Sequence, residues 1–271
     1  MLQQEEKSGL KTGYLIFALI FFAYIMIYMT RNCFSAAMAQ LVKEGVMKKS
    51  QTGLIVTLFY LVYAVLQVPG GMLADRTKPV WLILLGIIGA FVANAVIYFN
   101  HNYIVMLTFW VINGICQMGF WPAVFKVLAS EVIEKNVKNS RFIYSTASAV
   151  GGSFSYLVAA CVKKWNDNFL FSAVVMAITF ILIVVFSKPI NGVVSNKVTD
   201  KKEIKKTSED KTNMLKIFVK SGFLLTAPAI FIWSFVKKGT SSLMSTMLME
   251  SYENVSTSPT TTERRPCWTL P

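Results

Sequence analysis

Arg31 has the clearest chemical capacity in this sequence, because it interrupts a long apolar stretch. Residues 14–30 read YLIFALIFFAYIMIYMT, and residues 32–42 continue as NCFSAAMAQLV without a further charge. A single helix over 14–42 is long enough to cross a bilayer, and it would carry Arg31 near its middle. A guanidinium at that depth costs at least roughly 2.5–3.5 kcal/mol, so we expect it to face a bundle interior or a hydrated cavity. A buried cation without an acidic partner favours the binding of an anion.

The residues around Arg31 support this interpretation. Tyr24, Tyr28 and Ser35 are spaced so that they share one helical face with Arg31. An alternative stays open at this stage, in which the membrane span ends at Thr30 and the arginine side chain extends to water among the lipid headgroups.

Polar and aromatic side chains recur at helical spacing in three later apolar stretches. They are Tyr60, Tyr63 and Gln67; Asn113, Gln117 and Trp121; and Tyr144, Ser148, Gly151 or Gly152, and Ser155. Such stripes can face a hydrated cavity, where hydroxyls and amides bind a polar solute. The alternative is helix–helix packing, which is favoured for residues 151–153 and stays open for the others. Lys126 lies on the opposite helical face from Gln117 and is interpreted as a boundary charge, not a ligand.

The composition is that of a polytopic membrane protein. Hydrophobic residues make up 54% of the chain and charged residues 15%, whereas soluble domains average about 25% charged residues. The net charge of +13 lies mainly between the apolar stretches. This distribution indicates membrane topology and contact with anionic lipids, and it argues against nucleic acid as a partner.

Residues for catalysis or cofactor binding are lacking. The one histidine, His101, lies in a polar NHN turn and is interpreted as a solvated loop residue. The four cysteines show no CxxC spacing, and a G-x-x-x-x-G-K-[ST] phosphate loop is missing. The chain is therefore predicted not to be an enzyme and to need no cofactor or metal.

Six apolar stretches are long enough for membrane-spanning helices, and a seventh candidate begins at Phe223. The six lie at about 14–42, 53–74, 80–99, 103–127, 141–162 and 169–187. Most Lys and Arg residues between them fall on one side, which includes the N-terminal residues and the 188–220 segment. The positive-inside rule therefore predicts a cytoplasmic N-terminus, and we expect the plasma membrane as the location.

The turn after the second apolar stretch carries the most specific pattern in the chain. Residues 70–79 read GGMLADRTKP. Paired glycines let two helices approach closely, and the acid and base that follow can latch a tight turn between helices. The spacing G-x-L-A-D-R-x-x-P resembles the cytoplasmic signature loop of the major facilitator superfamily. This resemblance implies that Gly71, Asp75 and Arg76 act as a conformational latch and not as a substrate site.

Further motifs resemble the organophosphate:phosphate antiporter branch of that superfamily. They are YMTRN at 28–32, the 71–79 turn and QMGFWP at 117–122. The resemblance implies that Arg31 binds substrate phosphate and that Lys237, where the family has an arginine, assists it from the second half. A lysine keeps the charge but loses the bidentate fork of arginine.

Two more positions depart from the family pattern. Gln67 stands where some members carry a lysine, and Ser148 stands where some carry a histidine. The resemblance therefore supports the fold and phosphate-ester transport better than it supports one particular sugar or glycerol phosphate. We expect Gln67 and Ser148 to line a cavity for a small anionic metabolite, together with Tyr28 and Gln117.

The predicted fold class is an all-α membrane protein, with the six-helix amino-terminal bundle of a major facilitator fold, one further transmembrane helix, and truncation after it. The predicted parts are a cytoplasmic tail at 1–13, the bundle at 14–187, a basic cytoplasmic linker at 188–220, the seventh helix at 221–252, and an aberrant or disordered tail at 253–271. The polar, Thr-rich end of the chain favours a truncated or frame-shifted product, or a fragment.

Three functions are compatible with these observations. The first is a secondary transporter that moves an organic phosphate, or another organic anion, by alternating access in exchange for phosphate. The second is a membrane sensor for a sugar phosphate, and the third is a non-functional transporter fragment. The expected partners are a small anionic metabolite, phosphate, membrane lipids and a second transporter half.

Overall fold

The computed structural model describes most of the amino-terminal part of the chain. The described backbone covers 2–131, 137–187 and 190, with isolated helical positions at 232, 236, 240 and 251. Side chains are described for 15–128, 146–187, 190 and the same four isolated positions. The chain divides into two compact units, Met1–Lys211 and Thr212–Pro271, and every helix given below lies in the first. Apart from those isolated positions, the predicted linker, seventh helix and tail lie outside the described residues.

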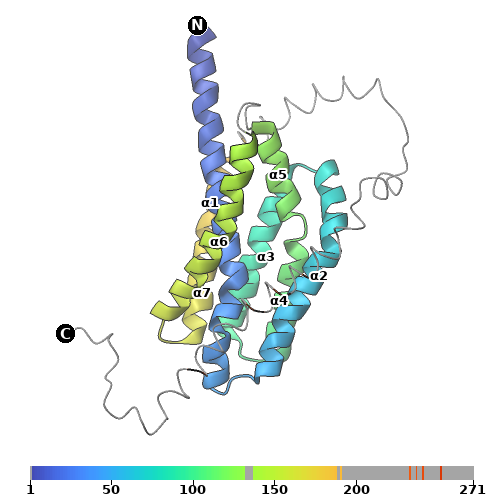
Figure 1. Ribbon diagram of the computed structural model, residues 1–271, viewed down its shortest axis with the longest axis vertical. Coiled ribbons are helices and arrows are strands. Elements are labelled where there is room, and N and C mark those ends of the chain that lie inside the picture. Colours follow the sequence, from blue (N-terminus) through green and yellow to red (C-terminus); the bar gives the residue numbers. More distant parts are fainter. Residues whose placement is uncertain are drawn as a thin grey trace, which may run out of the picture. The chain divides into compact units, whose positions relative to one another are not determined.

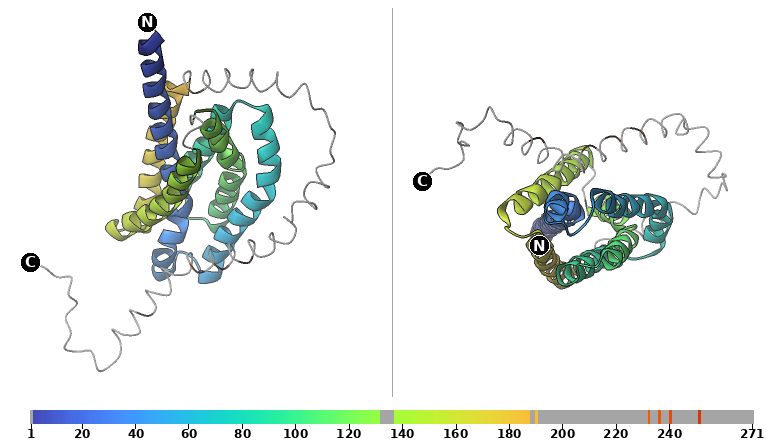
Figure 2. Two further views of the ribbon diagram at one scale, coloured as in Figure 1. Left: turned by 45° about the horizontal axis from the view of Figure 1, so that its top comes forward. Right: turned by 90° about the horizontal axis from the view of Figure 1, so that it is seen from below.

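Seven α-helices form the described part of the chain, where no β-strand occurs. They are α1 (Leu2–Lys43), α2 (Lys49–Arg76), α3 (Pro79–Phe99), α4 (Tyr103–Cys116), α5 (Phe120–Glu131), α6 (Val137–Cys161) and α7 (Trp165–Val185). The helices lie side by side, with α1 against α6 and α7, α3 against α4 and α7, and α2 against α4 (Figure 1 and Figure 2). The predicted all-α membrane fold is confirmed.

Several of these helices are suited to the bilayer. Five stretches of the described chain are long and apolar enough to cross a membrane: Leu15–Lys43, Lys49–Arg76, Pro79–Phe99, Tyr103–Leu128 and Trp165–Val185. The apolar part of α6, Thr146–Cys161, is a shorter helix. The first helix already begins at Leu2, where we expected a tail, because Gln, Glu, Lys and Leu in that segment favour helix formation.

One predicted helix, over 103–127, is broken in two. Residues 117–119 separate α4 from α5, and Pro122 follows directly after the break. Proline has no N–H, so it cannot donate to the carbonyl of Met118 four residues earlier. Gly70 of α2 packs against this exposed carbonyl so closely that a Cβ atom at Gly70 would lie 2.5 Å from the Met118 oxygen. The break and the glycine therefore fit together.

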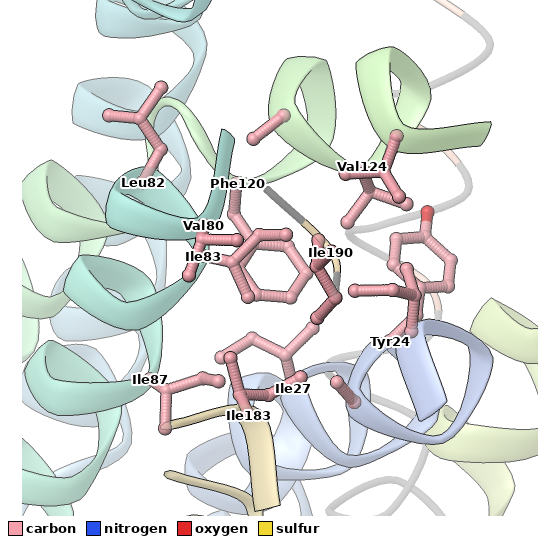
Figure 3. Close-up of a cluster of buried hydrophobic side chains, with 14 of the residues drawn as sticks. Tyr24, Ile27, Val80, Leu82, Ile83, Ile87, Phe120, Val124, Ile183 and Ile190 are labelled. Atoms are coloured by element: carbon pink, nitrogen blue, oxygen red, sulfur yellow. The ribbon is translucent and has the colours of Figure 1, made fainter. Parts of the chain in front are cut away.

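Two apolar clusters fill the bundle on either side of a polar layer. The first cluster joins α1, α3, α5 and α7, and Figure 3 shows its side chains around Ile27, Ile83 and Phe120. The second cluster contains Phe34, Trp110 and other aromatic side chains. Along α1 the first cluster ends at Ile27 and the second begins at Cys33, and buried polar residues lie between them. Arg31 belongs to this layer.

Buried polar contacts hold α1 against α3 and α7 next to the polar layer. The thiol of Cys33 donates to Asn94 Oδ1 at 3.1 Å, and Asn168 Nδ2 donates to the backbone carbonyl of Cys33 at 3.0 Å. Hydrogen bonds in such an apolar environment are costly to leave unmade. These contacts therefore fix the rotation of α1, on which the direction of its side chains depends.

Candidate functional site

Arg31 lies inside the bundle, in the middle of a helix that could span the membrane. The α1 helix continues past it to Lys43, and only 5% of the side chain is exposed. Its Nε donates a hydrogen bond of 2.9 Å to Gln117 Oε1 at the end of α4. The alternative in which the span ends at Thr30 and the side chain extends to headgroup water is therefore wrong.

Two tyrosine rings form the walls around the guanidinium. The Arg31 Cζ atom lies 4.8 Å from the ring centre of Tyr28 and 4.4 Å from that of Tyr63, within the range of cation–π attraction. The Tyr24 hydroxyl donates to the Tyr28 hydroxyl at 3.2 Å, which links the Tyr28 ring to the preceding turn of α1.

The Gln117 amide continues the network along α4. Gln117 Nε2 donates to Asn113 Oδ1 at 2.7 Å, one helical turn earlier. Both amide side chains are fully buried, and Asn113 Nδ2 has no hydrogen-bond partner within the described residues. Gln117 occupies the C-cap position next to the break between α4 and α5, so the break places its side chain against α1.

A second set of contacts brings α2 to the same place. The Tyr60 hydroxyl donates to Asn32 Oδ1 at 3.4 Å, and Asn32 Nδ2 donates to the Tyr28 carbonyl at 2.8 Å. Since Tyr63 lies one turn after Tyr60, α2 presents both rings to α1. The polar side chains of α1, α2 and α4 therefore converge on one layer of the bundle.

The charge of Arg31 is not balanced inside the described part of the chain. Its partners there are an amide oxygen and two tyrosines, all of them neutral, and no carboxylate in the described part pairs with it. A buried guanidinium is strongly stabilised by a charge-assisted bond to an anion, and its planar fork suits a phosphoryl or carboxyl group. The arrangement is therefore chemically suited to holding an anion.

The turn after α2 contains a second cation with a different environment. Lys126 Nζ of α5 donates to the backbone carbonyls of Ala74, Asp75 and Thr77 at 2.6, 3.2 and 3.0 Å. The last carbonyls of a helix lack intrahelical partners and carry partial negative charge, so a lysine there caps the helix. This interaction ties α5 to the turn that carries the signature pattern.

Comparison with known proteins places these features in a family. Residues 20–259 match the sequence profile of the Major Facilitator Superfamily. The chain belongs to the Major Facilitator Superfamily. This family and the relatives described next identify the chain as a non-enzymatic membrane protein, in agreement with the sequence-based prediction.

Three relatives of this superfamily member have names that state a function. The chain is 28% identical over 141 residues to the membrane sensor protein UhpC of Escherichia coli K12. This match covers 52% of the chain and 32% of UhpC. A probable hexose phosphate transport protein of Chlamydia trachomatis is 26% identical, over 62% of this chain and 38% of its own length. The glycerol-3-phosphate transporter of Bacillus subtilis is 26% identical, over 62% of this chain and 40% of its own. The predicted resemblance to the organophosphate:phosphate antiporter branch is confirmed.

A solved structure supports the same fold. The chain superimposes with a TM-score of 0.67 on a bacterial homologue of the human lysosomal transporter Spinster, in an inward-facing and unoccupied conformation. The identity is 18%, and the match covers 88% of this chain and 56% of that one. This likeness concerns the fold alone. The chain spans about a third of the length of the relatives described above.

The predicted binding residues of this superfamily member differ in their relation to Arg31. Tyr28 and Gln117 contact Arg31 directly. Gln67 and Ser148 are half-buried on α2 and α6, and their part in binding stays a prediction. Lys237 lies outside the described residues. Tyr63 and Asn113 belong to the helical stripes for which the sequence left open both solute binding and helix packing, and the structure places Tyr63 against Arg31 and Asn113 against Gln117.

The predicted latch also stays a prediction, with one change in its geometry. Asp75 and Arg76 are exposed at the end of α2. The close helix approach expected of the glycine pair occurs at Gly70, whereas a Cβ atom at Gly71 would meet open space. Lys126, which the sequence suggested to be only a boundary charge, provides the hydrogen bonds to this turn.

Proposed function

We propose that this chain forms part of a secondary transporter that moves an organic phosphate, or another organic anion, across the plasma membrane by alternating access in exchange for phosphate. The observation that carries the proposal is the burial of Arg31 among neutral partners in the middle of the bundle. The names of the Chlamydia and Bacillus relatives, which specify hexose phosphate and glycerol-3-phosphate, support an anionic phosphate ester as the substrate.

Each predicted residue has a defined task in this proposal. Arg31 binds the anionic group, and Lys237 assists it as a second cation. Tyr28, Gln67, Gln117 and Ser148 line the cavity, where their hydroxyl and amide groups accept or donate hydrogen bonds to the solute. No cofactor takes part, because the concentration gradients of the two exchanged solutes are enough to drive exchange.

The turn that follows α2 controls the change between conformations. Gly71, Asp75 and Arg76 form the latch, with the N-terminus and this turn on the cytoplasmic side. A second transporter half supplies the opposite wall of the cavity, as in transporters that are built from two repeats. Membrane lipids surround the exposed apolar faces of the helices.

A sensor of a sugar phosphate is the second candidate function. The similarity to the membrane sensor UhpC favours it, since a sensor would use the same anion site without moving the ligand. The two functions differ in one measurable property, because only a transporter releases its ligand on the other side of the membrane.

Binding and exchange of radiolabelled phosphate test the proposal. The full chain, purified in detergent, is expected to bind phosphate, and Arg31→Gln is expected to weaken binding by about 100-fold or more while the helical content is unchanged. In liposomes preloaded with phosphate, exchange identifies a transporter, whereas binding without exchange, also when a second transporter half is present, identifies a sensor. Failure of the unmodified chain to bind phosphate or a phosphate ester would overturn both functions.

A further inference from the structure

Four buried asparagines in the described part of the chain can be compared, and one of them differs. Asn32, Asn94 and Asn168 each donate from Nδ2 to a backbone carbonyl, those of Tyr28, Ala90 and Cys33. Asn113 is equally buried, but its Nδ2 has no acceptor within the described residues. A buried donor without an acceptor is costly, and native structures rarely leave one unmatched without a functional reason.

The direction of the Asn113 amide follows from Arg31. A guanidinium can only donate, so Gln117 must present its oxygen to Arg31 Nε. The Gln117 nitrogen then points along α4 and requires an acceptor, which is Asn113 Oδ1. The nitrogen of Asn113 is therefore left as a donor at the end of this series of hydrogen bonds. Flipping either amide would place two donors or two acceptors against each other.

The length of this series of hydrogen bonds limits which part of a ligand the Asn113 donor can reach. Hydrogen bonds of 2.9 and 2.7 Å and two amide groups separate Arg31 Nε from Asn113 Nδ2, so the two nitrogens lie at most about 10 Å apart. A phosphate ester whose phosphoryl group is held by the Arg31 guanidinium is long enough to reach a donor within that distance. An oxygen on the carbon skeleton of a phosphate ester can reach it.

We propose that Asn113 is a specificity-determining residue, whose Nδ2 donates a hydrogen bond to a hydroxyl oxygen of a phosphorylated polyol while Arg31 holds its phosphoryl group. The inference rests on the proposed function, because it requires that the site binds a phosphate ester. It adds a residue that selects esters with hydroxyl groups over alkyl phosphates of equal charge.

A pair of matched ligands tests the inference. Glycerol 3-phosphate and n-propyl phosphate have the same charge and carbon number, but only the first has hydroxyl groups on its skeleton. The unmodified full chain is expected to bind glycerol 3-phosphate about tenfold more tightly. In Asn113→Leu this preference is expected to vanish, so that glycerol 3-phosphate and n-propyl phosphate bind within about twofold of each other.

Two further variants separate recognition from folding. Asn94→Leu removes another buried amide outside the site, and it is expected to lower thermal stability while the ligand preference is kept. Asn113→Ala removes the same amide by shortening the side chain, so the preference is expected to vanish in it as well.

Three results would overturn the inference. The preference could survive in both Asn113 variants, or the affinities for both esters could fall by the same factor in Asn113→Leu, which would assign Asn113 to positioning Gln117 and Arg31. The third result is an unmodified chain without any preference between the esters. By contrast, an unmodified chain that binds no phosphate compound overturns the proposed function, and this inference falls with it.

Discussion

Arg31 and Lys126 are two cations within one helical bundle, and their environments differ fundamentally. Lys126 donates to three backbone carbonyls at the end of α2. Arg31 contacts one amide oxygen and two tyrosines in the middle of the bundle. The lysine therefore completes a structural cap, whereas the charge of the arginine is left without an anionic partner among the described residues.

The position of each cation along the helices explains this difference. A helix end offers free carbonyls with partial negative charge, and a lysine that reaches them is stabilised by the protein alone. The carbonyls in a helix interior are already bonded, so Arg31 depends on side chains from α2 and α4. We infer that Lys126, whose donors are all taken up by backbone carbonyls, stabilises the fold. We infer that Arg31, whose charge has no anionic partner among the described residues, binds a ligand.

Removal of the arginine charge is expected to have the largest effect. Arg31→Gln should weaken phosphate binding by about 100-fold or more, because loss of a buried charge partner typically costs about 2–5 kcal/mol. Arg31→Lys should retain part of the affinity, since it keeps the charge without the bidentate fork. Titration calorimetry in detergent measures both. Wild-type affinity in Arg31→Gln would exclude this residue from the site.

The next largest effect is expected where α2 touches the helix break. Gly70→Ala should reduce the free energy of unfolding by about 1–3 kcal/mol, because its Cβ atom would meet the carbonyl of Met118. The matched control is Gly71→Ala, which should have no destabilising effect, since the space beside Gly71 is open. Denaturant unfolding in detergent tests the pair, and equal effects at both positions would contradict the packing described above.

A smaller effect is expected from the loss of the lysine cap. Lys126→Met should lower the free energy of unfolding by about 1–2 kcal/mol, because the carbonyls of Ala74, Asp75 and Thr77 lose their donor. Phosphate affinity should stay within about twofold, since this residue contributes no ligand contact. A large loss of phosphate affinity in a folded Lys126→Met protein would end the distinction between the two cations.

The smallest effect is expected at the aromatic wall. Tyr63→Leu removes the ring beneath Arg31 and should weaken phosphate binding by about fivefold, in line with a cation–π contribution of about 1 kcal/mol. Tyr63→Phe keeps the ring and should change the affinity less. If Tyr63→Phe weakened binding more than Tyr63→Leu, the hydroxyl and not the ring would be the important group.

The sequence carries enough information for the location of the anion site. The apolar residues on both sides of Arg31 made a continuous helix and a buried cation predictable from the energetic cost of a charge in the membrane. The stripes on the later helices also contained Tyr63, Asn113 and Gln117. Residue spacing can show that side chains share one face of a helix, but it cannot show which neighbouring helix that face contacts.

The remaining features depend on tertiary packing and could not be read from the sequence. The break at 117–119 occurs because Pro122 leaves a carbonyl unbonded, and Gly70 of a different helix covers it. The partners of Lys126 are determined by the place where α2 ends beside α5. The orientation of the Asn113 amide follows from Arg31 through Gln117, over residues 86 positions apart in the chain.

The most direct test of the central claim is to locate a bound anion. An experimental structure of the full chain with tungstate, a dense analogue of phosphate, would show its position by anomalous scattering. We predict a peak within hydrogen-bonding distance of the Arg31 guanidinium, between α1, α2 and α4, that is lost in Arg31→Gln. A peak at Lys126, or one that persists without Arg31, would contradict the account.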